Sequence, residues 1–334
     1  MTNIKKIGFS ALAGALAMTS ANAASLSVTG ETQISYTKGG GYQSDGNPLG
    51  QSNTITFEAA GELDNGVTVA YKRTTTDTFA ADDSELVFGN ILGGTLAMQS
   101  TGSPLDGIDN KTPTAHNDAE GMVGSIADVS GANGDFGIRY TLSDVMGTGL
   151  KLDYNYVPVH GSGDATGDEG YSGSTLGTED AHDITISGSV PGVEGLAVGA
   201  GYSKRNYDLK AGSGPVQSRE DATVYATYAY GPVTIGYQVG GHDAAGAGAQ
   251  SYKNTYMGIS YAVSDDLSIS YNNTESRKVN QNAWADNAQE WDSISASYSM
   301  GGMTLNIADS DCGNCSYTSG KSESGTTVSM TVAF

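Results

Sequence analysis

Hydrophobic and polar residues alternate one by one along most of this chain. In residues 25–36, one set of alternate positions is polar throughout, while the other set carries mainly Leu, Val, Ile and Tyr. Successive side chains of a β-strand point to opposite faces, so this pattern predicts a strand with one polar and one apolar face. No helical spacing of any length competes with it. The chain is therefore predicted to be all β.

The same alternation recurs as far as the C-terminus and predicts sixteen strands. Their connections alternate between short turns and longer polar loops. The turn Asp64-Asn65-Gly66 is a strong hairpin signal, because Asn-Gly suits the positive φ of a tight turn. The longer loops are predicted at about residues 38–52, 76–83, 102–134, 159–180, 206–220, 241–252, 275–290 and 309–324. Strands connected in this order form an antiparallel meander.

A meander of this length must protect its two edges, and closing into a barrel removes them. A ring of sixteen strands leaves a lumen that side chains do not fill, so the polar face is predicted to line water. The apolar face then points into lipid, where a closed barrel pairs every backbone group. Tyrosines at the ends of the apolar faces fit an aromatic girdle, and alternating short and long connections fit periplasmic turns and outer loops. The prediction is a transmembrane antiparallel barrel; the alternative is a soluble secreted β-sandwich or solenoid.

Composition weighs against that soluble alternative. Hydrophobic residues are 38% and charged residues 16% of the chain, against about 45–50% and about 25% in soluble domains. A sandwich needs a dry core of large residues, which this chain lacks. The formal net charge of −21 makes a nucleic-acid partner improbable, because such a field repels phosphate.

The N-terminus predicts export. Lys5 and Lys6 precede a small-residue apolar stretch over residues 7–18, and Ala21-Asn22-Ala23 fits a cleavage site. The apolar stretch is too short to span a bilayer. Residues 1–23 are therefore predicted to be a signal peptide for the Sec pathway, and residues 24–334 the barrel domain.

Together these features resemble the Gram-negative general porin family, with the alphaproteobacterial porins most similar. The resemblance is carried by the signal peptide, Gly-Glu-Leu-Asp-Asn-Gly at residues 61–66, the strand count, the long third loop and the terminal Phe334. It implies an outer-membrane channel for passive diffusion of ions and small hydrophilic solutes, with no enzyme activity and no cofactor. It also implies a homotrimer, with a nonpolar wall near the first strands as the interface.

The resemblance implies further partners and roles. The barrel would contact the lipid bilayer and lipopolysaccharide, and Phe334 would be part of the signal that the outer-membrane assembly machinery reads. The third loop, from Gly102 to about Asn133, would fold into the lumen and narrow it. Porin constrictions of this kind set loop acids against a basic cluster on the opposite wall.

The charges of this chain fit that arrangement only in part. The third loop carries the acids Asp106, Asp109, Asp118, Glu120 and Asp128. Strand parity turns the bases Lys72, Arg139 and Lys151 into the lumen, with Arg205 as a fourth candidate. The first two strands instead point Glu31, Glu58 and Glu62 inward. We therefore predict a net acidic, cation-preferring constriction; the alternative is that the loop acids are merely solvated.

Other chemistry is weakly indicated. Acidic groups in the outer loops, such as Asp164, Asp168 and Glu169, could bind Ca²⁺, although they lack EF-hand spacing. Cys312 and Cys315 have no second pair for zinc, so a loop disulfide is favoured. Two other functions stay open: a plugged surface barrel or adhesin, and a substrate-specific channel, for example for sugars. The latter would need aromatics along the lumen, for which Tyr225, Tyr256 and Trp291 are the candidates.

Overall fold

The computed structural model describes most of the chain after residue 24. The described residues are 25–39, 47–77, 81–100, 102–117, 121, 126–133, 135–160, 178–207, 218–243, 250–280, 283–284 and 288–334. The predicted signal peptide lies outside these residues. Within the part of the chain that is described, no helix is long and apolar enough to cross a bilayer.

The described elements are almost entirely strands, as the alternation predicts. The strands are β1 (Ser25–Gly39), β2 (Leu49–Glu62), β3 (Thr68–Thr75), β4 (Ala81–Ile91), β5 (Gly94–Gln99), β6 (Gly137–Leu142), β7 (Lys151–Val157), β8 (Thr178–Ser189), β9 (Leu196–Tyr207), β10 (Arg219–Tyr230), β11 (Val233–Asp243), β12 (Ser251–Ala262), β13 (Leu267–Asn280), β14 (Ala283–Trp284), β15 (Gln289–Met300), β16 (Met303–Gly313) and β17 (Ser322–Ala333). Short 3-10 turns, η2 (Asp106–Ile108), η4 (Val145–Gly147) and η6 (Cys315–Tyr317), lie in the connections.

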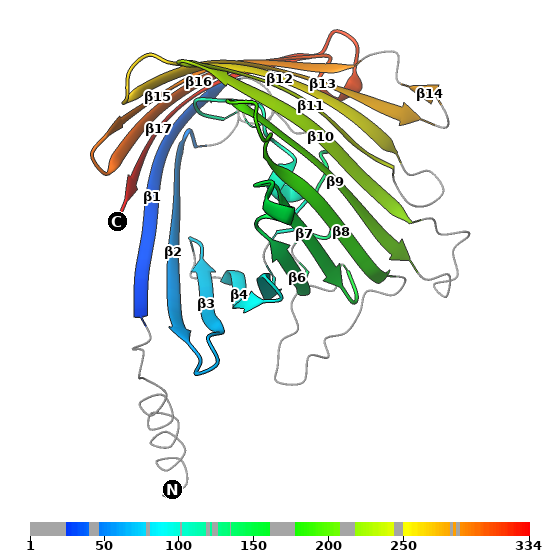
Figure 1. Cartoon of the computed structure of the whole chain (residues 1–334). Helices are drawn as coiled ribbons and strands as arrows, with labels where there is room; N and C mark the ends of the chain where they lie inside the picture. Colours follow the sequence, from blue (N-terminus) through cyan, green and yellow to red (C-terminus); the bar gives the residue numbers. More distant parts are fainter. Residues whose placement is uncertain are drawn as a thin grey trace, which may run out of the picture.

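The sheet closes on itself. Each long strand pairs antiparallel with the next, and β1 pairs with both β2 and β17, so the described strands form a closed ring (Figure 1). The two-residue β14 pairs only with the end of β13, and β13 also pairs directly with β15. Among the described residues the wall therefore has sixteen long strands, and the predicted antiparallel barrel is confirmed.

The two faces of the wall separate polar from apolar side chains. On β13, Ile269 and Tyr271 are exposed on the outside, while Ser270 and Asn272, which alternate with them, are buried on the inside. The neighbouring strands repeat this division in register, for example where Tyr271 faces Ile294 on β15. Lipid can therefore be met by apolar side chains and water by polar ones.

Several strands extend further than the apolar alternation predicts. β16 ends at Gly313 and β17 begins at Ser322, both inside the predicted loop 309–324. The outward positions there are occupied by Asp309 and Asp311. Beyond the hydrocarbon layer the outward face no longer needs apolar residues, so the hydrophobic pattern stops although the backbone hydrogen bonds continue.

Buried apolar residues form small clusters. One consists of Leu105, Ile108 and Val129, all from the connection between β5 and β6. This connection, residues 100–136, is called the inner loop below. Its buried apolar residues indicate that it packs against the inside of the barrel wall.

Candidate pore constriction

The inner loop is bound to the inside of the barrel by hydrogen bonds that reach several strands. On one arm, Gly131 N–H donates to Asp221 of β10 at 3.1 Å, and Ala132 N–H donates to Asp183 of β8 at 3.3 Å. On the other arm, the backbone N–H groups of Ala115 and His116 donate to serines of β13 and β15. The predicted inward fold of the third loop is confirmed.

Inward glycines make room for this loop. A Cβ atom at Gly201 of β9 would lie 2.5 Å from Leu105 Cδ1, and one at Gly258 of β12 would lie 2.7 Å from the Pro113 carbonyl oxygen. Real Cβ atoms do not approach other atoms so closely. Part of the high glycine content therefore has a definite use, which is to let the loop backbone lie flat on the wall.

The loop brings three carboxyl groups together. Asp106 begins η2 and Asp109 follows it, and the Asp109 N–H donates to the Asp106 carbonyl at 3.4 Å. Burial raises the pKa of Asp106. Burial, followed by the nearby charges of Asp128 and Asp106, raises the pKa of Asp109 to about 8. Like charges held close together resist joint ionisation, so this cluster carries less than its full negative charge at neutral pH.

The three carboxyl groups of this cluster are those of Asp106, Asp109 and Asp128. Hydrogen bonds hold Asp106 and Asp128 in place. Asn133 Nδ2 donates to Asp106 Oδ1 at 3.1 Å, and the Tyr256 hydroxyl donates to Asp128 Oδ1 at 2.6 Å. Asp118 and Glu120, also predicted to belong to the constriction, lie outside the described residues.

The predicted bases differ in how far their charge is neutralised. Arg139 Nη2 and Lys151 Nζ both pair with the buried Asp153, at 3.1 and 2.8 Å. Lys72 on β3 stands in register between Glu58 of β2 and Glu85 of β4. Within the described residues, Lys72 forms no ion pair shorter than 4.0 Å. It is a single positive charge between two acids of the neighbouring strands.

Sequence reasoning missed a second ion cluster on the wall. Asp221 is fully buried and binds Arg205 at 2.6 Å and Arg219 at 3.0 Å. Arg219 was predicted to lie in the loop 206–220, but it is the first residue of β10. Continuing the strand parity of residues 224–230 backwards would have placed Arg219 and Asp221 on the inside.

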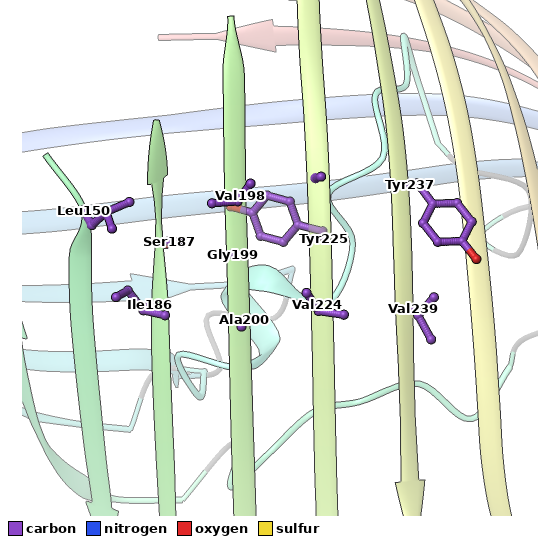
Figure 2. Close-up of a pocket in the computed structure, with 11 residues that line it drawn as sticks. Leu150, Ile186, Ser187, Val198, Gly199, Ala200, Val224, Tyr225, Tyr237 and Val239 are labelled. Atoms are coloured by element: carbon purple, nitrogen blue, oxygen red, sulfur yellow. The ribbon is translucent and has the colours of Figure 1, made fainter. Parts of the chain in front are cut away.

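The aromatic residues considered for a sugar track lie under the inner loop. Tyr256 and Trp291 are almost completely buried. Tyr225 packs on the Leu105 cluster. Its ring also lies over Gly199 of the neighbouring strand (Figure 2). On its outward face, the wall at this point forms an apolar groove lined by Val198, Ala200 and Val224 among others. These aromatics therefore fasten the loop and are not stacked along the passage.

Phe334 and the two cysteines make contacts of their own. Phe334 exchanges two backbone hydrogen bonds with Gly30 of β1, at 3.0 and 2.9 Å, and its ring is exposed on the outside. A disulfide joins Cys312 and Cys315. These cysteines are buried together with Trp291, and Ile126 of the inner loop packs on the same cluster.

In the described ranges, no group of three or more His, Cys, Asp or Glu residues is placed so that it could hold a metal ion. The outer-loop acids Asp164, Asp168 and Glu169, considered for Ca²⁺, lie outside those ranges. The charged groups of the constriction are carboxyl groups on the loop, acids with one lysine on the wall of β2 to β4, and arginines and a lysine bound to buried aspartates.

Comparisons with known proteins agree with this geometry. The family model for Gram-negative porins matches residues 10–310. No curated protein matches the chain in sequence. A mutant Rh. blastica porin is similar in structure, with a TM-score of 0.57, 18% identity, and 93% of this chain and 100% of that chain covered.

Two further solved structures are similar in fold. The anion-selective porin from Comamonas acidovorans has a TM-score of 0.63 at 10% identity and covers 93% of this chain and 100% of its own. The trimer form of OmpT, an outer membrane protein of Vibrio cholerae, has a TM-score of 0.64 at 10% identity, covering 93% of this chain and 99% of that chain. At these identities the likeness concerns the fold.

Proposed function

Because the chain belongs to the Gram-negative porin family, we propose that it forms an outer-membrane channel that prefers cations. Family and fold make it a porin, whose water-filled lumen passes ions and small hydrophilic solutes. The preference for cations is the finer step. It does not follow from the fold, since a porin of similar structure is anion-selective.

The observation that carries the preference is the unequal neutralisation of lumen charges. Arg139 and Lys151 share the carboxylate of Asp153, and Arg205 and Arg219 share that of Asp221. Each cluster keeps only one net positive charge. The wall of β1 to β4 instead carries acids on its inward positions, and the base Lys72 stands between two of these acids. The inward acids on that wall are Glu31, Glu58, Glu62 and Glu85.

This charge distribution works on ions without any covalent step. Acids that line a narrow aqueous passage raise the local concentration of cations and lower that of anions. Size is limited by the inner loop, which takes up part of the lumen cross-section. The channel is therefore passive, and its selectivity depends on salt because free ions screen the wall charges.

Planar-bilayer recording in a KCl gradient tests this function. We expect a steady ohmic conductance and a reversal potential with the sign of the potassium equilibrium potential. Replacing Asp106 and Asp109 by Asn should move the reversal potential toward zero at alkaline pH. The matched control replaces Asp265 and Asp266, two acids of an exposed turn, and should leave it unchanged. A reversal potential of the opposite sign in the native protein would disprove cation preference.

We also propose that the protein assembles as a homotrimer after export by its signal peptide. A similar solved structure is described as a trimer form. The outward face of β1 and β2 offers exposed apolar residues, including Leu26, Val28 and Phe57. Chemical cross-linking of the protein in detergent should give bands of one, two and three copies and none larger. Recovery of the single chain alone would contradict the assembly.

A further inference from the structure

Gln238 is an unusual residue on the inside of β11. Its inward neighbours along the strand are Gly236 and Gly240, so it is a single long side chain between two positions without one. The side chain is completely enclosed, with no exposed surface. The inner loop covers it, and its amide is bonded to the loop backbone.

The amide bonds to residues 108–111 of the inner loop from both sides. Its Oε1 accepts the N–H of Lys111 at 2.8 Å. Its Nε2 donates to the carbonyl oxygen of Ile108 at 2.9 Å and to that of Asp109 at 2.5 Å. The bonded backbone groups flank Asn110, so one side chain determines the path of residues 108–111.

The strand in turn holds the amide. Gln238 Nε2 lies 2.7 Å from Thr223 Oγ1 of β10, which orients the amide plane. Buried backbone N–H and C=O groups need partners, and a loop inside a barrel has no ladder to supply them. Here one glutamine supplies an acceptor oxygen and a two-hydrogen donor together, as a primary amide can.

We propose that Gln238 is a specificity-determining positioning residue of the channel, because its amide fixes residues 108–111 of the inner loop and with them the place of the Asp109 carboxyl beside the passage. This inference rests on the proposed function, since selectivity requires a conducting pore. Without the amide, the loop keeps its anchors on either side of this segment, Leu105 packed at Gly201 and the Pro113 carbonyl that accepts from Asn272, but loses the one between them. Residues 108–111 then move as a segment, and both the cross-section of the passage and the local charge vary with them.

The test compares Gln238→Ala and Gln238→Glu with the native protein at pH 9, where Asp109 is charged. Gln33→Ala is the matched control, because Gln33 also points inward but bonds Thr331 on the neighbouring strand. We expect higher open-channel current noise and a cation-to-anion permeability ratio lower by about twofold in Gln238→Ala, as for a unit charge displaced by a few Å in water. The control should match the native channel.

Gln238→Glu keeps the side-chain volume and the acceptor but removes the donors, so it should show the added noise even if the alanine variant is not recovered folded. Heat-modifiable migration on gels reports folding independently of conductance. Native noise and native reversal potential in a folded variant would overturn the role of Gln238 alone. A native protein that does not conduct would overturn the proposed function and this inference with it.

Discussion

Pro113 of the inner loop lies on Gly236 of β11 so closely that a Cβ atom added to the glycine would be 2.4 Å from the proline Cδ. The proline ring cannot yield by rotating, so we expect Gly236→Ala to push the loop toward the lumen axis. Single-channel conductance should fall, and overpacking should cost about 1–3 kcal/mol of stability.

Gly313→Ala is the control for this substitution, because the nearest atom to its Cβ would be the Glu290 carbonyl oxygen at 3.9 Å. Bilayer recording on both variants tests the expected fall in conductance, and thermal unfolding tests the expected loss of stability. Equal conductance in the two variants would contradict the close packing of the loop.

The ionisation of Asp109 predicts a pH-dependent selectivity. With a pKa of about 8, the carboxyl is mostly neutral at pH 7 and charged at pH 9. The cation-to-anion permeability ratio should therefore rise across this interval in the native channel and rise much less in Asp109→Asn. Reversal potentials taken at several pH values measure this permeability ratio. The same rise in both proteins would contradict the assignment to Asp109.

The same group predicts a pH dependence of stability with the opposite sign. The folded pKa of Asp109 lies above the ordinary value for aspartate, so folding favours the protonated form. Its contribution to stability is complete below about pH 4 and is lost as the pH rises to about 8. Asp109→Asn should remove this part of the dependence, which thermal unfolding between pH 6 and pH 9 can measure.

Lys72 and Glu58 should shift selectivity in opposite directions. They stand in register on β3 and β2, and both point into the lumen. Lys72→Gln should raise the cation-to-anion ratio and Glu58→Gln should lower it. A unit charge about 4 Å from an ion in water is worth about 1 kcal/mol, so the change should reach about two- to fivefold at low salt and fade at high salt. Shifts of the same sign would show that these side chains do not act through their charge.

The disulfide between Cys312 and Cys315 should contribute little to the global stability of the barrel. The loop that it closes is very short, and the chain-entropy model gives about 2 kcal/mol for such a loop. Reductant should lower the unfolding temperature of the native protein slightly and leave a variant with alanine at both positions unchanged. Failure of that variant to form a barrel would contradict this view of the disulfide.

Phe334 is expected to act in assembly more than in the folded barrel. Its ring is exposed, whereas its bonds to Gly30 involve only backbone atoms. Phe334→Ala should therefore refold in detergent like the native protein but reach the outer membrane of a Gram-negative host in lower amount. Ile307→Ala, another exposed outward residue, serves as the control. Equal amounts of all three proteins in the membrane would argue against a signal at the C-terminus.

The apolar alternation was sufficient to predict the barrel but not the length of its strands. Residues 25–36 predicted the first strand, and β1 continues to Gly39. Lipid imposes the period of two only on outward positions within the hydrocarbon layer. Past that layer Asp309 and Asp311 occupy outward positions on a strand that continues unchanged, so a hydrophobic signal could not find where it ends.

The constriction was predictable in its location and only partly in its charges. Strand parity placed Arg139 and Lys151 inside, and it puts Asp153 on the same face of β7 as Lys151. It could not show that Arg139 of β6 binds the same carboxylate, because that depends on the register of the two strands. Gln238 carried no signal at all. A glutamine between two glycines becomes a distinct feature only when a loop more than a hundred residues away lies across it.

The sequence by itself determined the class of this protein: an all-β wall, its strand count, a long third loop and an acidic balance. These follow from local periodicity and composition, because lipid on one side and water on the other act on every residue of a strand. Only the tertiary structure decided which charges are neutralised, where residues 108–111 of the inner loop are held and why glycines line the path of that loop. Those depend on contacts between segments far apart in the chain, where a few Å determine whether a charge faces an ion or a partner.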